Sequence, residues 1–280
     1  MNSKIRWKLS PFLTRGVLII FAIINIFPLM FALMTSFKTN QEFYKSIWAL
    51  PTTLHFENYS KAFVTGRIGE YALNSAIVAV ITLAITVVFS TIAAYALSRL
   101  HVPGAEIILT ALILLQSLPT ESILIPEYMI IGRLHLLKNL YLAMALPYSA
   151  WYIPANIVIL ANFFATVPME LIESARIDGA SEMKALINII LPLMKAPVST
   201  CLVLDFCGVW GELMWAQIVT LTSNKGLTLT IGLLNFKGMF GTDWGAMTAA
   251  ICMISIPLIV AFIFTQKYFV QGLTSGGVKG

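Results

Sequence analysis

Long apolar stretches with few charges alternate with more polar connections along the whole chain. A helix needs about 20 mostly apolar residues to cross a bilayer, and six stretches reach that length. These predicted spans are residues 16–37, 73–97, 107–131, 141–164, 197–219 and 246–264. The pattern therefore predicts an all-α fold, a polytopic membrane bundle of about six helices. We expect residues 1–280 to form one transmembrane domain.

Several of these spans contain prolines, among them Pro257 in the sixth. Pro119 and Pro126 lie in the third span, and Pro147 and Pro154 lie in the fourth. A proline inside a helix removes one backbone hydrogen bond and crowds the preceding turn. We therefore expect the third span to be broken at Pro119 and at Pro126.

The composition excludes several classes of protein. Apolar residues make up 58% of the chain and charged residues 11%, and the mean hydropathy is +0.84. Soluble domains have about 45–50% apolar and about 25% charged residues. An ordinary cytoplasmic enzyme, a disordered protein and a nucleic-acid-binding domain are therefore excluded. The net charge of +5 fits basic loops beside a membrane better than nucleic-acid contacts.

Basic residues before the first span indicate how the chain is oriented. They are Lys4, Arg6, Lys8 and Arg15, with no acid among them. Basic residues favour the cytoplasmic side, so we expect a cytoplasmic N-terminus. The first span is also too long for the apolar core of a cleaved signal peptide. With six spans the C-terminus is cytoplasmic as well. The connection 165–196 then lies inside, while 38–72 and 220–245 face outward.

Residues 168–192 have the pattern of two short helices joined at a glycine. Pro168 suits a first helical turn, and Gly179 can take the left-handed conformation that ends a helix. Ser181 can cap the second helix. The second helix is predicted to have one apolar face, at Met183, Leu186, Ile187 and Ile190. On these features alone, a surface helix lying against the bundle is the favoured interpretation.

The amino-acid sequence of this segment also contains a more specific motif. Residues 173–180 read E-S-A-R-I-D-G-A, and Leu191-Pro192 follow. This resembles the E-A-A-x-x-D-G-A loop of binding-protein-dependent ABC importer permeases, with Ser174 where alanine is usual. Further segments resemble the carbohydrate (MalG-like, MetI-like) subfamily. They are 27–29, 35–38, 210–215 (W-G-E-L-M-W, with glycine for the usual asparagine) and 266–280.

The resemblance implies that the 168–192 loop is a coupling helix seated in a cleft of a cytoplasmic ATPase. The residues that match the family's coupling motif are Glu173, Ala175, Asp178, Gly179 and Ala180. Their acids would pair with the ATPase, and the glycine would permit the bend.

The partners of the chain also follow from the resemblance. The sequence has no G-x-x-x-x-G-K-[ST] phosphate loop, so ATP and Mg would be bound by a partner. The resemblance implies a second homologous permease subunit, a dimer of ABC ATPases and an extracytoplasmic sugar-binding protein, assembled in a bacterial plasma (inner) membrane. No cofactor, metal-ligating residue or catalytic residue is assigned to this chain. An ion-coupled secondary transporter is the alternative, and a membrane-embedded glycosyltransferase is a weaker one because the acids are dispersed.

Acids within the spans indicate where a substrate could pass. Asp205 and Glu212 lie seven residues apart in the fifth span, and two helical turns place them on one face with Gly208 and Trp215. Carboxylates accept hydrogen bonds from sugar hydroxyls, and indole rings cover apolar sugar faces. The same acids could instead bond to neighbouring helices or cap broken backbone.

Two further polar residues follow prolines within the spans. Glu121 comes after Pro119, where a cavity or a restarted helix would each suit a carboxylate. The sequence leaves both roles open. Asn156 after Pro154 is a weaker candidate for the pathway.

Overall fold

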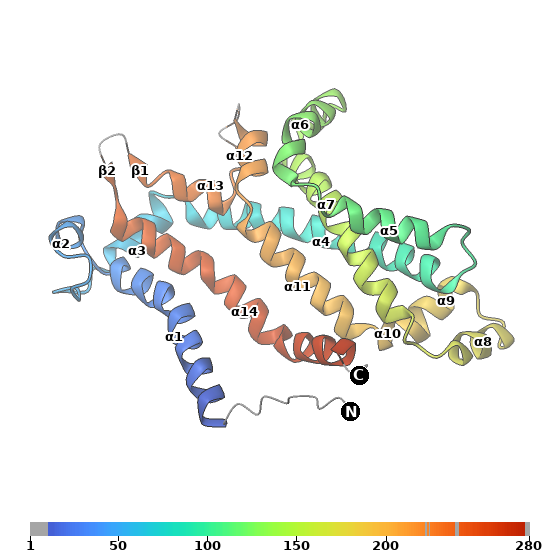
Figure 1. Cartoon of the computed structure of the whole chain (residues 1–280). Helices are drawn as coiled ribbons and strands as arrows, with labels where there is room; N and C mark the ends of the chain where they lie inside the picture. Colours follow the sequence, from blue (N-terminus) through green and yellow to red (C-terminus); the bar gives the residue numbers. More distant parts are fainter. Residues whose placement is uncertain (1–10, 222, 224, 239–240, 278–280) are drawn as a thin grey trace. The chain divides into compact units, whose positions relative to one another are not determined.

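The computed structural model describes residues 11–221, 223, 225–238 and 241–277 (Figure 1). Lys4, Arg6 and Lys8 lie outside the described residues, as do positions 278–280 of the family-like tail. The chain folds into two compact units, one formed by Met1–Ile68 with Leu233–Ser255 and the other by Gly69–Gly232 with Ile256–Gly280. Each unit is described by itself.

The first unit contains the first span and the polar connections next to it. Its elements are α1 (Pro11–Ser36), α2 (Asn40–Lys45), α3 (Glu57–Val64), the end of α13 (Leu229–Leu234), the antiparallel strands β1 (Lys237–Gly238) and β2 (Gly241–Thr242), and the first part of α14 (Trp244–Gly277). Thr39 and Glu42 form a reciprocal capping box that fixes the start of α2. The connection after the first span is therefore folded.

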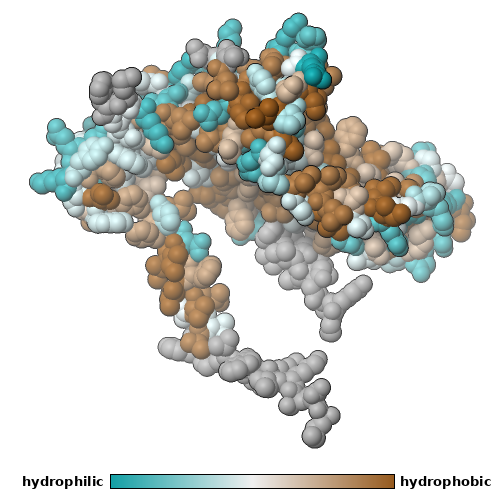
Figure 2. Space-filling view, turned by 45° about the horizontal axis from the view of Figure 1, so that its top comes forward, coloured by the Kyte–Doolittle hydropathy of each residue, from teal (hydrophilic) through white to brown (hydrophobic). Residues whose placement is uncertain are grey.

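Helix α1 is apolar on all sides, and most of its large apolar side chains are exposed in the described part of the chain. The most apolar 18-residue window of Leu13–Ser36 has no buried residue, and Figure 2 shows the helix as a mostly hydrophobic column. Such a helix is unstable in water because it has no polar face. It must therefore be covered by lipid or by another membrane subunit.

The second unit holds most of the predicted spans. Its elements are α4 (Ile68–Arg99), α5 (Ala105–Leu115), the 3₁₀ turn η1 (Thr120–Ile123), α6 (Leu124–Arg133), η2 (Leu136–Lys138), α7 (Leu140–Phe164), α8 (Met169–Ile177), α9 (Glu182–Ala185), the π-helical turn η3 (Leu186–Ile190), α10 (Leu191–Leu193), α11 (Lys195–Gly211), α12 (Met214–Thr220) and the rest of α14. Helices α5, α11 and α12 all pack against α7, so α7 is the centre of this unit.

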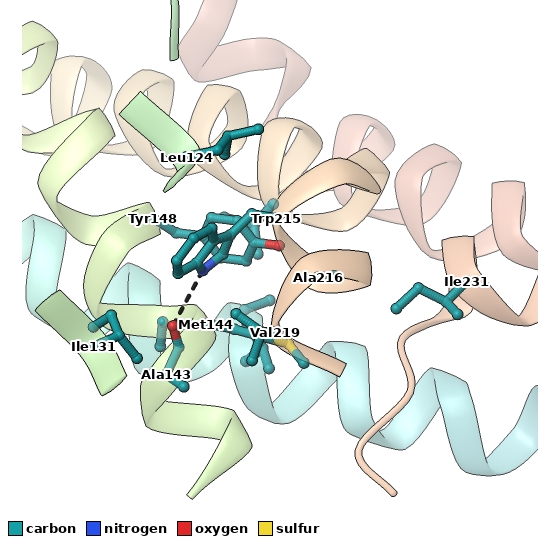
Figure 3. Close-up of a cluster of buried hydrophobic side chains, with 13 residues drawn as sticks. Leu124, Ile131, Ala143, Met144, Tyr148, Trp215, Ala216, Val219 and Ile231 are labelled. Carbon is teal, nitrogen blue, oxygen red and sulfur yellow. Dashed lines mark hydrogen bonds between the residues drawn. The ribbon is translucent and has the colours of Figure 1, made fainter. Parts of the chain in front are cut away.

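Two clusters of buried side chains hold the second unit together. One cluster joins α4, α7 and α12 around Tyr148 and Trp215, and its members are drawn in Figure 3. The indole N–H of Trp215 donates to the carbonyl of Ala143 at 3.1 Å. The other cluster joins α4, α7 and the 168–192 hairpin around Phe164 and Ile172.

Four of the predicted spans are confirmed as single helices, namely α1, α4, α7 and α14. Within the described residues these four are long and apolar enough to cross a membrane, and six spans result if two bent pairs are counted. Helix α5 and the segment Thr120–Arg133 meet at 92°, and Glu182–Leu193 meets Lys195–Gly211 at 80°. The all-α polytopic membrane fold is therefore confirmed.

The predicted break at Pro126 is wrong, whereas the break at Pro119 is present. Pro119 has extended backbone geometry (ψ 125°) directly before η1. Pro126 lies in the first turn of α6. The first N–H groups of a helix have no partner within it, so a proline there breaks no bond.

The fifth predicted span, 197–219, is also not one continuous helix. Helix α11 ends at Gly211, Glu212 is extended (φ −69°, ψ 135°), and α12 starts at Met214. The helical spacing that placed Glu212 and Trp215 on one face with Asp205 therefore fails after Gly211.

Candidate functional site

The bend of the 168–192 hairpin is a complete Schellman motif. The N–H of Ala180 donates to Ala175 O at 2.9 Å, and the N–H of Gly179 donates to Arg176 O at 3.0 Å. Gly179 has φ +78°, a conformation that costs other residues about 1–2 kcal/mol. Ser181 caps α9 by accepting from the N–H of Lys184. The predicted helix–glycine–helix arrangement is confirmed.

The inward face of the hairpin differs from the predicted one. Leu186 and Ile190 are buried as expected, but Met183 and Ile187 are 50% and 52% exposed. A residue turns by about 100° in a helix, so Met183 lies to one side of the face that Leu186 occupies. The inward face is centred on Leu186 and the buried Ala185.

Polar contacts tie the hairpin to α4 and to the end of α7. Glu182 accepts from Arg176 Nε and from the Tyr95 hydroxyl of α4, each at 2.7 Å. These contacts lower the pKa of Glu182. The bond from Arg176 has the largest effect and the bond from Tyr95 the next largest. Arg99 of α4 donates to the carbonyls of Phe164 and Val167. The base of the hairpin is therefore held in a fixed position.

The five predicted coupling residues divide into two groups. Glu173, Asp178 and Gly179 are exposed at the tip and Ala180 is half-buried, while Ala175 is 3% exposed and packs inward. The tip also presents a residue that the motif comparison did not assign. Ile177 is 86% exposed. In the sequence it stands between two charged residues, Arg176 and Asp178, and this position could have indicated its exposure.

Asp205 lies in the protein interior between α11 and α7. Its side chain is 2% exposed, and Asn156 Nδ2 donates to its carboxylate at 2.6 Å. Next to it, a Cβ atom at Gly208 would collide with the hydroxyl of Tyr152. Both residues therefore hold α7 close to α11.

Asn156 supplies a buried donor, and its loss should destabilise the bundle. We expect Asn156→Ala to lower the thermal stability of the purified protein, because a hydrogen bond to a charged group contributes about 1.5–3 kcal/mol. Asn188→Ala is the control, since Asn188 is exposed on the hairpin. Thermal unfolding in detergent measures both variants. Equal melting temperatures for the two would contradict this account of Asp205.

Glu212 bridges the break between α11 and α12. Its carboxylate accepts from the N–H of Trp215 at 2.9 Å, from the N–H of Ala216 at 3.1 Å and from the Tyr148 hydroxyl. The side chain therefore caps α12, whose first N–H groups have no helical acceptor. Trp215 itself is fully buried in the cluster of Figure 3.

A cavity of about 350 Å³ brings two of the predicted pathway acids together. Its lining residues are Thr120, Glu121, Leu124, Trp151, Tyr152, Glu212 and Met214. Asp205, Gly208 and Trp215 are not among them. The sequence analysis did not identify the two aromatic residues, Trp151 and Tyr152. The feature that could have indicated them is that they are neighbours in the fourth predicted span. The cavity combines two carboxylates with two aromatic rings, which suits a ligand rich in hydroxyl groups.

Comparison with known proteins relates this architecture to transport systems. Residues 86–275 match the family model described as "binding-protein-dependent transport system inner membrane component". The probable ABC transporter permease protein YurM of Bacillus subtilis is 34% identical over 98% of this chain and 91% of its own length. The trehalose/maltose transport system permease protein MalG of Thermococcus litoralis is 35% identical over 94% of each chain.

A solved structure confirms the fold. It is a bacterial ABC transporter involved in the import of the acidic polysaccharide alginate, and one of its chains matches with a TM-score of 0.79. The match has 21% identity and covers 92% of this chain and 95% of the other. On the family match and these relatives, the chain belongs to the inner membrane components of binding-protein-dependent transport systems, and it is a permease subunit, not an enzyme.

Proposed function

We propose that this chain is the transmembrane permease subunit of an ATP-driven sugar importer. The curated relatives include transport proteins named for trehalose and maltose and for melibiose, raffinose and stachyose. The single observation that carries the coupling role is the hairpin, whose base is fixed while its acidic tip is exposed. A fixed, exposed tip can receive force from a partner and pass it to α4 and α7.

The tip of the hairpin would dock into a cleft of a cytoplasmic ATPase. Glu173 and Asp178 would meet basic groups, and Gly179 would keep the bend compact. Ala180 would lie at the edge of the contact, and Ala175 would support it from below. When ATP and Mg bind the ATPase dimer, the hairpins of two permease subunits would move together. This chain would bind neither ATP nor Mg.

The cavity at Glu121 and Glu212 would form part of the sugar pathway. Its aromatic side chains, Trp151 and Tyr152, would cover the apolar faces of sugar rings. Asp205, Gly208 and Trp215 would shape the wall of the pathway through their packing. We propose that residues 1–280 act as one permease domain.

The complete importer would contain a second homologous permease and an extracytoplasmic sugar-binding protein. The protein would lie in a bacterial plasma membrane with both termini in the cytoplasm. The outward connections 38–72 and 220–245 would then receive the binding protein. An ion-coupled transporter is the alternative, and the exposed acidic hairpin favours the ATP-driven mechanism.

Purification and uptake measurements test the proposal. The chain, purified in mild detergent, should bring with it an ABC ATPase. Vesicles containing the complex should take up a neutral saccharide only with internal ATP and the binding protein. Uptake that follows an ion gradient without ATP would replace this proposal by the secondary transporter.

Glu121 can be tested separately because it is exposed in the cavity. We expect Glu121→Gln to reduce sugar uptake by about threefold to tenfold, the loss of roughly one hydrogen bond of 0.5–1.5 kcal/mol. ATPase association should be unchanged. Glu106→Gln is the matched control, since Glu106 is an exposed acid at the start of α5. Wild-type uptake by Glu121→Gln would remove this residue from the pathway.

A further inference from the structure

The segment Ser46–Pro51 follows α2 and is strongly apolar. It reads S-I-W-A-L-P and contains no charge. Ile47, Trp48 and Leu50 are 44%, 68% and 77% exposed. In a connection surrounded by water, three large apolar side chains so exposed in one short segment would be unfavourable.

Trp48 packs against the apolar surface of α1. Its ring lies 5.2 Å from that of Phe31 and 5.9 Å from that of Phe27, measured between centroids. Both phenylalanines belong to the candidate span Leu13–Ser36. At 1.5 Å per residue they lie about 8 Å and about 14 Å before the end of α1. The segment therefore turns back along the span instead of leading away from it.

The backbone of this segment has an internal partner for two of its carbonyls. Lys38 is 1% exposed, and its ammonium group donates to Ser46 O at 3.2 Å and to Ile47 O at 2.8 Å. Backbone carbonyls that enter a bilayer need such partners because lipid chains offer none. A lysine in this position satisfies that requirement.

The other end of the segment is also fixed. Glu42 accepts from the N–H of Thr52 at 3.1 Å and from its hydroxyl, while the capping box holds Glu42 at Thr39. The apolar side chains are therefore held on the side of the span by two polar contacts. They cannot fold inward without breaking both.

We infer that Ser46–Pro51 is a membrane-interface anchor, with Trp48 and Leu50 inserted among the lipids that surround α1. The surface is continuous with the exposed surface of a membrane-spanning helix, and tryptophan prefers the boundary between head groups and acyl chains. Exposed Lys45 can reach the lipid phosphates beside it. The anchor would hold the 38–72 connection at the membrane surface.

Lipid-borne quenchers test this inference without any assumption about the transported substrate. The full chain with its co-purifying subunits is placed in vesicles of phosphatidylcholine and phosphatidylglycerol, with bromine atoms either near the head groups or at the chain ends. The fluorescence difference between wild type and Trp48→Phe isolates Trp48. We expect this component to lose most of its intensity with bromine near the head groups and less with bromine at the chain ends.

Trp210→Phe is the control with a buried indole. The Trp210 side chain is 5% exposed and its ring lies 5.2 Å from that of Phe206, so the Trp210 component should be quenched less by brominated lipid. Quenching of Trp48 by aqueous iodide would show that the segment lies in water. Protection from both quenchers would show that another subunit covers it. Either result overturns the inference. If Trp48→Phe does not express, Trp48→Tyr replaces it, because the difference from wild type under selective indole excitation again isolates Trp48.

Discussion

Replacing Gly179 by valine is expected to reduce ATP-driven uptake at least about tenfold and to weaken association with the ATPase. Gly179 has φ +78°, and a residue with a Cβ atom loses about 1–2 kcal/mol in that conformation, more when it is β-branched. At the tip this strain would distort the proposed contact with the ATPase, and every 1.36 kcal/mol lost from that contact corresponds to about a factor of ten. The bulk added at the tip would also enter the proposed contact with the ATPase.

The structure separates these effects from damage to the permease itself. A Cβ atom at Gly179 meets no other atom within 4 Å, and the same holds at Gly104, which has φ +75°. Gly104→Val therefore carries a similar backbone strain outside the hairpin. We expect it to keep most of its uptake and its full ATPase association. If both variants lose uptake equally, strain in the chain explains the loss and the coupling role of Gly179 is contradicted.

The hairpin could be predicted from the sequence because its signals are local. Asp178-Gly179 and Ser181 each act on backbone groups within a few residues, and the structure has the Schellman motif and the cap where the pattern placed them. The face of each hairpin helix that packs inward is determined by its contacts with α4 and α7, which are distant in the sequence. That face was therefore predicted only in part, at Leu186 and Ile190.

The acidic residues in the spans show where sequence reasoning reaches its limit. The residues around Glu212 are apolar enough for one continuous membrane-spanning helix, and no proline indicates that the helix is broken there. The break exists because Glu212 can cap α12 while Tyr148, 64 residues earlier, donates to the same carboxylate. The cavity likewise unites Glu121 and Trp151 from different spans. Such long-range proximity has no local signature, so only the acids themselves could be identified as candidates.

Replacing Glu212 by alanine is expected to destabilise the subunit severely as well as to stop uptake. Three donors would lose their acceptor, namely the N–H groups of Trp215 and Ala216 and the hydroxyl of the buried Tyr148. Each buried donor left without a partner costs about 1–3 kcal/mol, so a total loss of about 3 kcal/mol or more is expected. The measurement is the thermal unfolding of the purified protein, together with the yield of folded material.

The cavity offers a matched control for this variant. Glu121 lines the same cavity but is exposed, so Glu121→Ala should reduce uptake while the melting temperature stays near that of the wild type. Glu212→Gln should fall between the two, because its amide keeps one acceptor oxygen and loses the other. A Glu212→Ala protein that melts like the wild type but does not transport would contradict the capping role. The carboxylate would then serve the pathway alone, and the break between α11 and α12 would need another stabilising group.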